Sequence, residues 1–289
     1  MTWFPASCAL RRSKTITSEV TVFALSLLYA ATMNGFAQQL RNWRRERRYS
    51  QLGLATEASI SPRHLSFLES ERARPSRDMV LRLAEALELP RHATNSILGA
   101  AGFAPHFQQT PLDADALSPV REALERVMDN HAPYPAVLMD RDWTILRLNS
   151  TAQALFAPAG IGVGSTGFAI LDLPGGPAAW VENWPEVGHH LLTRLQAEIR
   201  ALGGNPKLER AAARLQRDAS IEGHMARTPP PAVIPTIYKA GPMRLSLFST
   251  FLQIGGVEDI TLADLRVELM FPMDTATKET LENLGKEIG

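Results

Sequence analysis

The stretch SQLGLATEASISPRHLSFLESERARPS, residues 50–76, constrains the fold of this chain more than any other. Its apolar residues recur at helical spacing on both sides of a short break, which indicates two short helices around a tight turn. Ser61 can accept an N–H bond as the N-cap of the second helix, and Pro62 needs no N–H at the first helical position. Ser59 occupies the turn, where glycine would be easiest to accommodate. The segment therefore predicts a helix pair whose second helix has a well-marked start.

Apolar residues at the same spacing continue on both sides of this pair. Phe36, Leu40 and Trp43 mark one face of a preceding helix, and two further apolar repeats follow the pair. Helices of about ten residues with short connections are typical of compact bundles. We expect an all-α, helix-turn-helix bundle of about five helices over residues 34–103.

The chain is neutral overall, but its charge is unevenly distributed. Residues 36–77 contain nine Arg and no Lys against four Glu, a net charge of +5, whereas the chain from residue 78 onward carries −7. A small basic segment joined to a larger acidic one indicates a polyanion-binding head on a body with another task. Arg72, Arg74 and Arg77 lie beyond the helix pair, where they can contact a phosphate backbone without reading sequence.

The second helix of the pair is the expected reading helix. Its free N–H groups and positive dipole end suit an approach to phosphates. Arg63 can bind guanine through two hydrogen bonds, and Phe67 can touch a thymine methyl group. Both residues project away from the apolar face formed by Leu65 and Leu68.

Four strings of this region resemble the XRE (Cro/repressor-like) helix-turn-helix family over residues 36–90: S-Q-x-x-L-A at 50–55, I-S-x-x-x-L-S at 60–66, L-E at 68–69 and R-x-R-P-S at 72–76. The resemblance implies that the second helix enters the major groove, that dimers read paired half-sites, and that Gln51 contacts a phosphate or a base edge. The expected DNA-binding residues are Gln51, Ser61, Arg63, His64, Ser66, Phe67, Arg72, Arg74 and Arg77.

Two positions depart from the family pattern. Ser59 and Glu71 stand where the family usually has glycine. A non-glycine residue with positive φ costs about 1 kcal/mol. Glu71 also adds a negative charge near phosphates, so we expect it to weaken DNA binding somewhat.

The chain changes character after residue 103. Residues 104–117 are polar, contain two prolines and lack periodicity, which predicts an interdomain linker. Beyond a helix that starts near residue 118, we expect about five antiparallel strands with helices inserted after the second, which makes residues 118–289 an α+β domain. In the last strand, Val267 and Leu269 alternate with Arg266 and Glu268, so one face of the sheet should be buried.

This second segment resembles two related families. PAVLMDRDWTILRLNSTAQALF has the order strand, turn, strand, Asn, helix of PAS sensor domains. The segment as a whole is similar to the MmyB-like ligand-binding domain that often follows an XRE head, through VENWPEV at 181–187, ARTPPPAVIP at 226–235, LFSTFLQIGGVEDITLADLRVELMFP at 247–272 and the closing DTATKETLENL. The resemblance implies a PAS-like fold with a mostly apolar cavity for a small hydrophobic ligand, with a fatty acid as the leading candidate.

The candidate cavity residues are mainly aromatic. For each aromatic residue the alternative is an ordinary core position, and for Arg194 the choice lies between a ligand carboxylate and a surface salt bridge. The candidate ligand-binding residues are Trp143, Phe168, Trp184, Arg194, Phe248, Phe251 and Phe271.

Catalysis and metal binding find little support. The chain has no G-x-S-x-G, H-E-x-x-H or P-loop motif, and Cys8 is its only cysteine, which excludes disulfides and Cys-rich zinc sites. His189 and His190 are adjacent, so a helix would turn them about 100° apart and prevent chelation of one metal. A G-x-G-x-x-G string at 162–167 lacks the strand before it and the helix after it that a dinucleotide site needs, and is better interpreted as a loop. We expect no metal and no cofactor, apart from a bound fatty acid or similar ligand.

Residues 1–33 are expected to stand apart from the folded domains, as a mis-annotated start or a disordered leader. Arg11, Arg12 and Lys14 precede an apolar run of about 13 residues, which resembles a signal peptide but is shorter than the roughly 20 residues of a membrane span. We expect Met33 to be the true start, and a short membrane-associated leader is the alternative. Export would separate the basic head from DNA, so we expect a cytoplasmic protein without a membrane span.

These patterns predict a transcription regulator that binds double-stranded DNA as a homodimer and senses a small apolar ligand. The alternative is a protein-interaction scaffold whose head docks a partner protein and whose body is a ligand-free dimerising unit. The arginine distribution favours the first hypothesis, and salt-dependent retention on DNA would separate the two. An enzyme acting on a bound lipid or nucleotide is a third hypothesis, for which the sequence offers no catalytic constellation.

Overall fold

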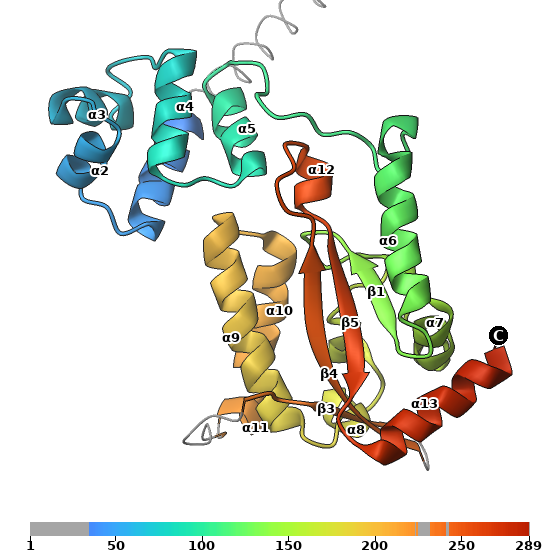
Figure 1. Ribbon diagram of the computed structural model, residues 1–289. Coiled ribbons are helices and arrows are strands. Elements are labelled where there is room, and N and C mark those ends of the chain that lie inside the picture. The colour runs from blue at the N-terminus through green and yellow to red at the C-terminus, as the bar shows by residue number, and fades with distance from the viewer. Residues whose placement is uncertain (1–34, 223, 225–231, 241–242, 289) are drawn as a thin grey trace, which may run out of the picture. The chain divides into compact units, whose positions relative to one another are not determined.

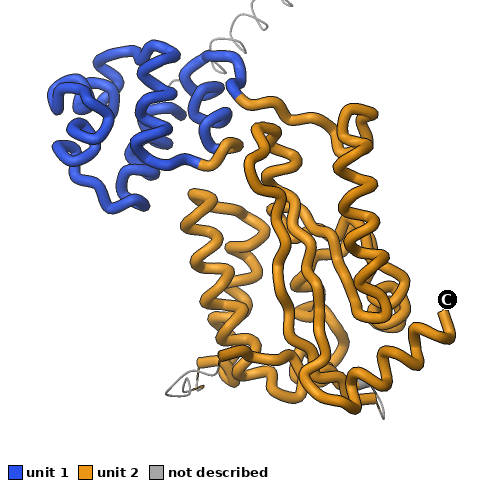
Figure 2. The backbone as a smooth tube through the Cα atoms, in the orientation of Figure 1, with its two compact units in different colours: residues 1–89, 93–106 blue, residues 90–92, 107–289 orange. Residues whose placement is uncertain are grey.

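The computed structural model describes residues 35–222, 224, 232–240 and 243–288 of the chain. The chain divides into two compact units, one that ends at residue 106 and one that starts at residue 107, with residues 90–92 grouped in the second (Figure 2). Each unit is described separately below. The expected leader, residues 1–33, lies outside the described residues.

The first unit is a bundle of helices, as the sequence predicts. Its described helices are residues 35–46, α2 (Gln51–Glu57), α3 (Pro62–Glu69), α4 (Arg77–Ala86) and α5 (Arg91–Ala100). Leu40, Leu54, Leu65, Leu83 and Ile97 contribute one fully buried side chain from each of these helices to a shared apolar core. The core therefore ties all five helices together.

Three serine caps fix where the helices of this bundle begin. The hydroxyl groups of Ser50, Ser61 and Ser76 each accept a hydrogen bond from the backbone N–H three residues further on, at 2.9, 3.1 and 3.2 Å. A cap of this kind stabilises a helix by about 1 kcal/mol. The predicted N-cap at Ser61 is thus confirmed, with Pro62 as the first residue of α3.

The second unit contains a five-stranded antiparallel sheet, which confirms the predicted α+β domain (Figure 1). The strands run in the order β2-β1-β5-β4-β3. Their bounds are β1 (Ala136–Met139), β2 (Ile145–Leu148), β3 (Thr236–Ala240), β4 (Met243–Gln253) and β5 (Arg266–Pro272).

Helices and short 3-10 turns surround this sheet. The helices are α6 (Ser118–Asn130), α7 (Ser150–Phe156), α8 (Pro177–Trp180), α9 (Trp184–Leu202), α10 (Pro206–Gln216), α11 (Ala219–Glu222), α12 (Ile260–Ala263) and α13 (Thr275–Ile288), and the 3-10 turns are η1 (Asp115–Leu117), η2 (Ala157–Ala159) and η3 (Ala169–Asp172). Part of the expected linker is bound to this unit, because the Thr110 N–H donates to Asp259 and the Ile260 N–H donates to the carbonyl of Gln108.

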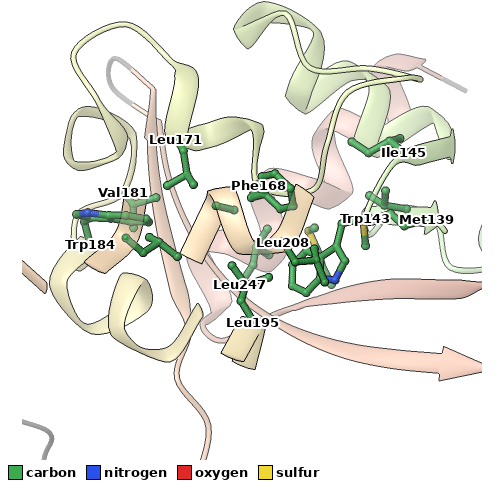
Figure 3. Packing of buried hydrophobic residues seen from close by; sticks show 14 of the residues in the cluster. Met139, Trp143, Ile145, Phe168, Leu171, Val181, Trp184, Leu195, Leu208 and Leu247 are labelled. Atoms are coloured by element: carbon green, nitrogen blue, oxygen red, sulfur yellow. The ribbon is translucent and has the colours of Figure 1, made fainter. Parts of the chain in front are cut away.

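Both faces of the sheet are covered. The side that we call the inner face packs against α9 and α10 and carries Val137, Met139, Ile145, Leu245, Leu247 and Met270 (Figure 3). The opposite side, the outer face, packs against α6 and α12 and carries Ala136, Leu138 and Val267. The alternation in β5 therefore does not separate a buried face from a solvent face, and the charged residues Arg266 and Glu268 point toward the larger core.

Asn149 fixes the junction between β2 and α7, as the PAS-type order predicts. Its side chain is 3% exposed and accepts hydrogen bonds from the backbone N–H groups of Ala136 and Ala152, both at 3.0 Å. Its amide donates to the carbonyl groups of Met128 and Tyr134. A buried amide with every group satisfied stabilises one arrangement of the strand and the two helix ends.

Candidate nucleic-acid interface and ligand-binding face

Both departures from the glycine pattern of the helix-turn-helix lie at left-handed backbone positions. Ser59, in the turn between α2 and α3, has φ of 52°, and Glu71, in the loop after α3, has φ of 63°. Glycine reaches this region without steric cost, whereas other residues lose about 1 kcal/mol there. The backbone at both positions therefore keeps the conformation that favours glycine, although the sequence has Ser and Glu there.

A buried carboxylate holds the helices of this interface together. Glu69, the last residue of α3, is 3% exposed and accepts two hydrogen bonds from Arg44 of the first helix, at 2.6 and 3.0 Å. Gln51 of α2 donates to the same carboxylate at 2.7 Å. Burial raises the pKa of Glu69, but the bonds from Arg44 and Gln51 outweigh it and leave the pKa below its ordinary range.

Two of the expected contact residues, Gln51 and Ser61, lie at helix N-termini. Gln51 is exposed, and its amide group is oriented by Glu69. Ser61 uses its hydroxyl oxygen as an acceptor for the His64 N–H, so the hydroxyl proton stays available to a phosphate oxygen. Sequence reasoning missed Glu69 and Arg44, although Glu69 belongs to one of the strings that carry the resemblance.

The two expected base-reading residues form a stacked pair on α3. The guanidinium of Arg63 lies over the ring of Phe67, 5.3 Å from its centroid. Arg63 is exposed, and within the described part of the chain it makes no ion pair or hydrogen bond through its side chain. His64, Ser66 and Phe67 are half-buried on the same helix. Stacking pre-orients the guanidinium and leaves its donors unoccupied.

The arginines around α3 differ in their surroundings. Arg72 and Arg74 are exposed in the loop beyond α3, whereas Arg77 is half-buried, with a guanidinium nitrogen 3.4 Å from the Nδ1 of His106. Arg45 and Arg48 of the first helix and its following turn are exposed, and among the described residues their side chains have no ion pair or hydrogen bond. Sequence reasoning gave these last two no role.

The expected ligand residues of the second unit do not all face one site. Phe248 and Phe271 stack on each other across β4 and β5, with ring centroids 5.4 Å apart, and by strand alternation they lie on the outer face. Trp184 lies at the far end of the inner core from Trp143 (Figure 3), where its Nε1 donates to Asp218 at 2.8 Å. The remaining four residues, Trp143, Phe168, Arg194 and Phe251, belong to one inner-face group.

Trp143 is the centre of that group. It is 4% exposed and lies in the connection between β1 and β2. Its backbone φ of 60° is unusual for a residue with a bulky side chain. Its ring lies 6.2 Å from that of Phe168, and its Nε1 donates to Glu198 at 3.0 Å. A Cβ added at Gly167 would come within 2.8 Å of Met139 and 3.2 Å of the indole, so this glycine is needed for packing.

Two arginines contact the Trp143 ring, but only one of them has an acidic partner. Arg266, with 7% of its side chain exposed, forms an ion pair with Glu198. Arg194 lies 4.6 Å from the Trp143 ring centroid and 3.7 Å from that of Phe251. Within the described ranges Arg194 makes no hydrogen bond or ion pair, and burial lowers the pKa of its guanidinium. The surface salt bridge that the sequence left open is not formed.

Comparison with known protein families identifies both units. A family model described as the MmyB-like transcription regulator ligand binding domain matches residues 120–284. The chain belongs to this family. A helix-turn-helix model matches residues 40–92, so this MmyB-like regulator carries a DNA-binding head and a ligand-binding domain, and it belongs to a family of transcription regulators rather than enzymes.

Comparisons with individual proteins add little. No curated protein matches the MmyB-like regulator. Among solved structures, an RNA-binding light-oxygen-voltage receptor is 13% identical, with 96% of this chain and 69% of that chain covered. Its TM-score of 0.26 is too low to support any argument about fold or function.

The remaining sequence motifs of the MmyB-like regulator have plain structural roles. The G-x-G-x-x-G segment is a loop that pairs with the edge of β2, through Gly164 N–H to the Ile145 carbonyl and Gly167 N–H to the Trp143 carbonyl. In the described part of the chain, no group of three His, Cys, Asp or Glu residues is arranged to hold a metal. Across those same residues, no helix has the length and apolarity needed to cross a bilayer.

Proposed function

We propose that this MmyB-like regulator binds a small apolar carboxylic acid, of which a fatty acid is the simplest example, and that it acts in the cytoplasm. The observation that carries the proposal is Arg194, a half-buried guanidinium between two aromatic rings without an acidic partner among the described residues. A planar guanidinium matches a carboxylate through two parallel hydrogen bonds. Trp143 and Phe251 would supply apolar surface for the body of the ligand.

We further propose that α3 enters the major groove of DNA. Arg63 and Phe67 would contact base edges, while the exposed loop arginines and the capped helix N-termini would contact phosphates. The proposed DNA-binding residues are Gln51, Ser61, Arg63, His64, Ser66, Phe67, Arg72, Arg74 and Arg77, with Arg45 and Arg48 as additional phosphate contacts.

The proposal includes a homodimer, because a single short reading helix covers only one half-site and paired half-sites match a two-fold protein. A ligand can change DNA affinity only if it binds two arrangements of that dimer with different affinity. Light scattering coupled to size exclusion, with and without ligand, tests the oligomeric state. A monomer at the concentration that saturates DNA would contradict this part of the proposal.

The ligand proposal is tested on the full chain. Native mass spectrometry of gently purified protein should reveal a bound mass in the range of a fatty acid, and calorimetric titration with dodecanoic acid should give saturable binding. Arg194→Met should weaken that binding by tenfold or more, since hydrogen bonds to charged groups contribute about 1.5–3 kcal/mol. Arg200→Met, at an exposed position of the same helix, is the matched control. Equal affinity in the two variants would exclude Arg194 as the carboxylate site.

DNA binding is tested separately by selection from random duplexes, followed by titration at several salt concentrations. Contacts to several phosphates predict a steep linear fall of log affinity with log salt. Binding without sequence preference, or without salt dependence, would contradict the assignment of α3 as a reading helix.

A further inference from the structure

A second ionisable group shares the inner face with Arg194. Glu268 of β5 lies directly opposite Phe251 of β4 and Val137 of β1, and therefore points to the same side of the sheet as these two apolar residues. It is half-buried. A carboxyl group in such surroundings is unfavourable unless it finds a hydrogen-bond or charge partner.

The arginines of the inner face do not supply that partner. Arg266 is paired with Glu198, and the Arg194 guanidinium lies over the ring of Phe251, the residue of β4 directly opposite Glu268. Among the described residues, no ion pair to Glu268 forms within 4.0 Å. Burial raises the pKa of the Glu268 carboxyl. A hydrogen bond from the Ser249 hydroxyl and the positive charges of Arg194 and Arg266 lower the pKa by less than burial raises it. Arg194 and Glu268 are therefore neighbours that do not bind each other.

Further hydroxyl groups lie around this pair. Ser249 is exposed although strand alternation places it on the inner face, so solvent reaches this part of the sheet. Tyr238 of β3 packs against the same core, and burial together with the negative charge of Glu268 raises the pKa of its hydroxyl. Tyr238 therefore stays neutral, and the residue of β5 directly opposite Phe251 is Glu268.

A cationic donor, Arg194, and a carboxyl acceptor without an ion pair among the described residues, Glu268, are neighbours beside the Phe251 ring. A plain fatty acid would occupy Arg194 and leave the Glu268 carboxyl with the Ser249 hydroxyl as its hydrogen-bond donor among the described residues, so that its second oxygen would lose solvent without gaining a partner, at a cost of about 1–3 kcal/mol. A ligand with a hydroxyl group near its carboxylate would satisfy both. An ammonium group would also donate to Glu268, but the positive charges of Arg194 and Arg266 disfavour it. The site is thus suited to a hydroxylated acid.

We infer that the ligand is an apolar carboxylic acid with a hydroxyl group a few bonds from the carboxylate, whose carboxylate binds Arg194 and whose hydroxyl donates to Glu268. This inference rests on the proposed function, because it assumes that Arg194 binds a carboxylate. It adds a specificity residue and a narrower ligand class. Sites built around a ligand hydroxyl discriminate strongly against analogues that lack it.

The test compares dodecanoic acid with 3-hydroxydodecanoic acid by calorimetric titration of the full chain. The hydroxylated acid should bind about tenfold tighter or more, which corresponds to about 1.4 kcal/mol. Glu268→Leu should abolish that preference while keeping affinity for dodecanoic acid. Glu268→Gln, which conserves shape, should reduce the preference if the leucine variant does not fold. Glu279→Leu, an exposed carboxylate on α13, is the matched control and should keep the full preference.

The possible outcomes distinguish failure of this inference from failure of the proposal that Arg194 binds a carboxylic acid. Equal binding of both acids by the natural chain would overturn the hydroxylated class and leave the carboxylic acid proposal standing. A preference that survives in both Glu268 variants would overturn the role of Glu268. Binding of neither acid would overturn the inference together with the proposed function.

Discussion

The two units use arginine in the same two ways. In each, one arginine pairs with a glutamate, Arg44 with the buried Glu69 in the bundle and Arg266 with the half-buried Glu198 beside the sheet. In each, another arginine lies over a phenylalanine ring and, among the described residues, has no acidic partner: Arg63 over Phe67 and Arg194 over Phe251. We expect the paired arginines to stabilise the fold, whereas Arg63 and Arg194, whose donors are unoccupied among the described residues, are the proposed contacts to DNA and to the ligand. Under this proposal, the partner of an arginine, rather than its exposure, distinguishes a structural role from a functional one.

The strongest way to break this comparison is to remove a glutamate from a structural pair. Glu69→Ala should destabilise the first unit by about 3–5 kcal/mol, because Arg44 would remain in a largely buried position without its partner. Urea unfolding of the full chain gives the free energy. Glu57→Ala, at an exposed position of α2, should change it by less than about 0.5 kcal/mol. A small effect at Glu69 would mean that the pair is not a structural one.

Removing a stacked arginine should affect recognition and spare the fold. Arg63→Ala should cost about 1–3 kcal/mol of DNA binding and relax the preference at one base position. Because Arg63 stacks on Phe67, the losses in Arg63→Ala and Phe67→Ala should not add in the double variant. Selection and titration on DNA measure both effects. Arg74→Ala is the contrast, with equal loss on all sequences, and a uniform loss in Arg63→Ala would refute its role as a reader.

Acidification should affect Glu69 and Glu268 differently, because folding shifts their pKa values in opposite directions. The pKa of Glu69 is lowered on folding, so its stabilisation is present above its unfolded pKa and is lost as pH falls through the folded value. The pKa of Glu268 is raised by burial, so its penalty appears as pH rises from the unfolded pKa through the folded one. Stability differences from Glu69→Gln and Glu268→Gln, measured by urea unfolding across acidic pH, should therefore slope in opposite directions. Parallel slopes would contradict the assignment.

The smallest expected effects concern the two strained backbone positions. Ser59→Gly and Glu71→Gly should each stabilise the first unit by up to about 1 kcal/mol, because both residues have positive φ. Glu71→Gly should also tighten DNA binding at low salt, since it removes a negative charge from the loop that carries Arg72 and Arg74. Glu71→Gln keeps the backbone strain and should show only the binding effect. Thermal melting and DNA titration distinguish the two contributions.

Local sequence signals predicted the elements well because their physical causes are local. Ser61 and Pro62 mark the start of α3, and Asn149 marks the start of α7. The sites were harder to predict. Phe248 and Phe251 are three residues apart on one strand and lie on opposite faces, and with both faces covered their hydrophobicity does not say which face meets a ligand.

Partner choice was not readable either. Arg44 and Arg63 are the same residue type in the same basic segment, but the tertiary fold brings Glu69 to Arg44, whereas the i, i+4 spacing of α3 places the Phe67 ring beside Arg63. For the same reason the sequence could not decide between a salt bridge and a ligand for Arg194. The Arg44–Glu69 and Arg194–Phe251 contacts join elements far apart in the chain, so no spacing rule predicts them.

The position of Trp143 gives the protein its own optical probe. The indole touches the guanidinium groups of both Arg194 and Arg266, and its Nε1 is bonded to Glu198. A ligand that moves Arg194 away from the ring would change the electric field at the excited indole, and therefore the wavelength and intensity of its fluorescence emission. The difference between the emission of the natural chain and that of Trp143→Phe would isolate this signal from the other four tryptophans. Occupancy of the inner face could then be followed in solution without any added label.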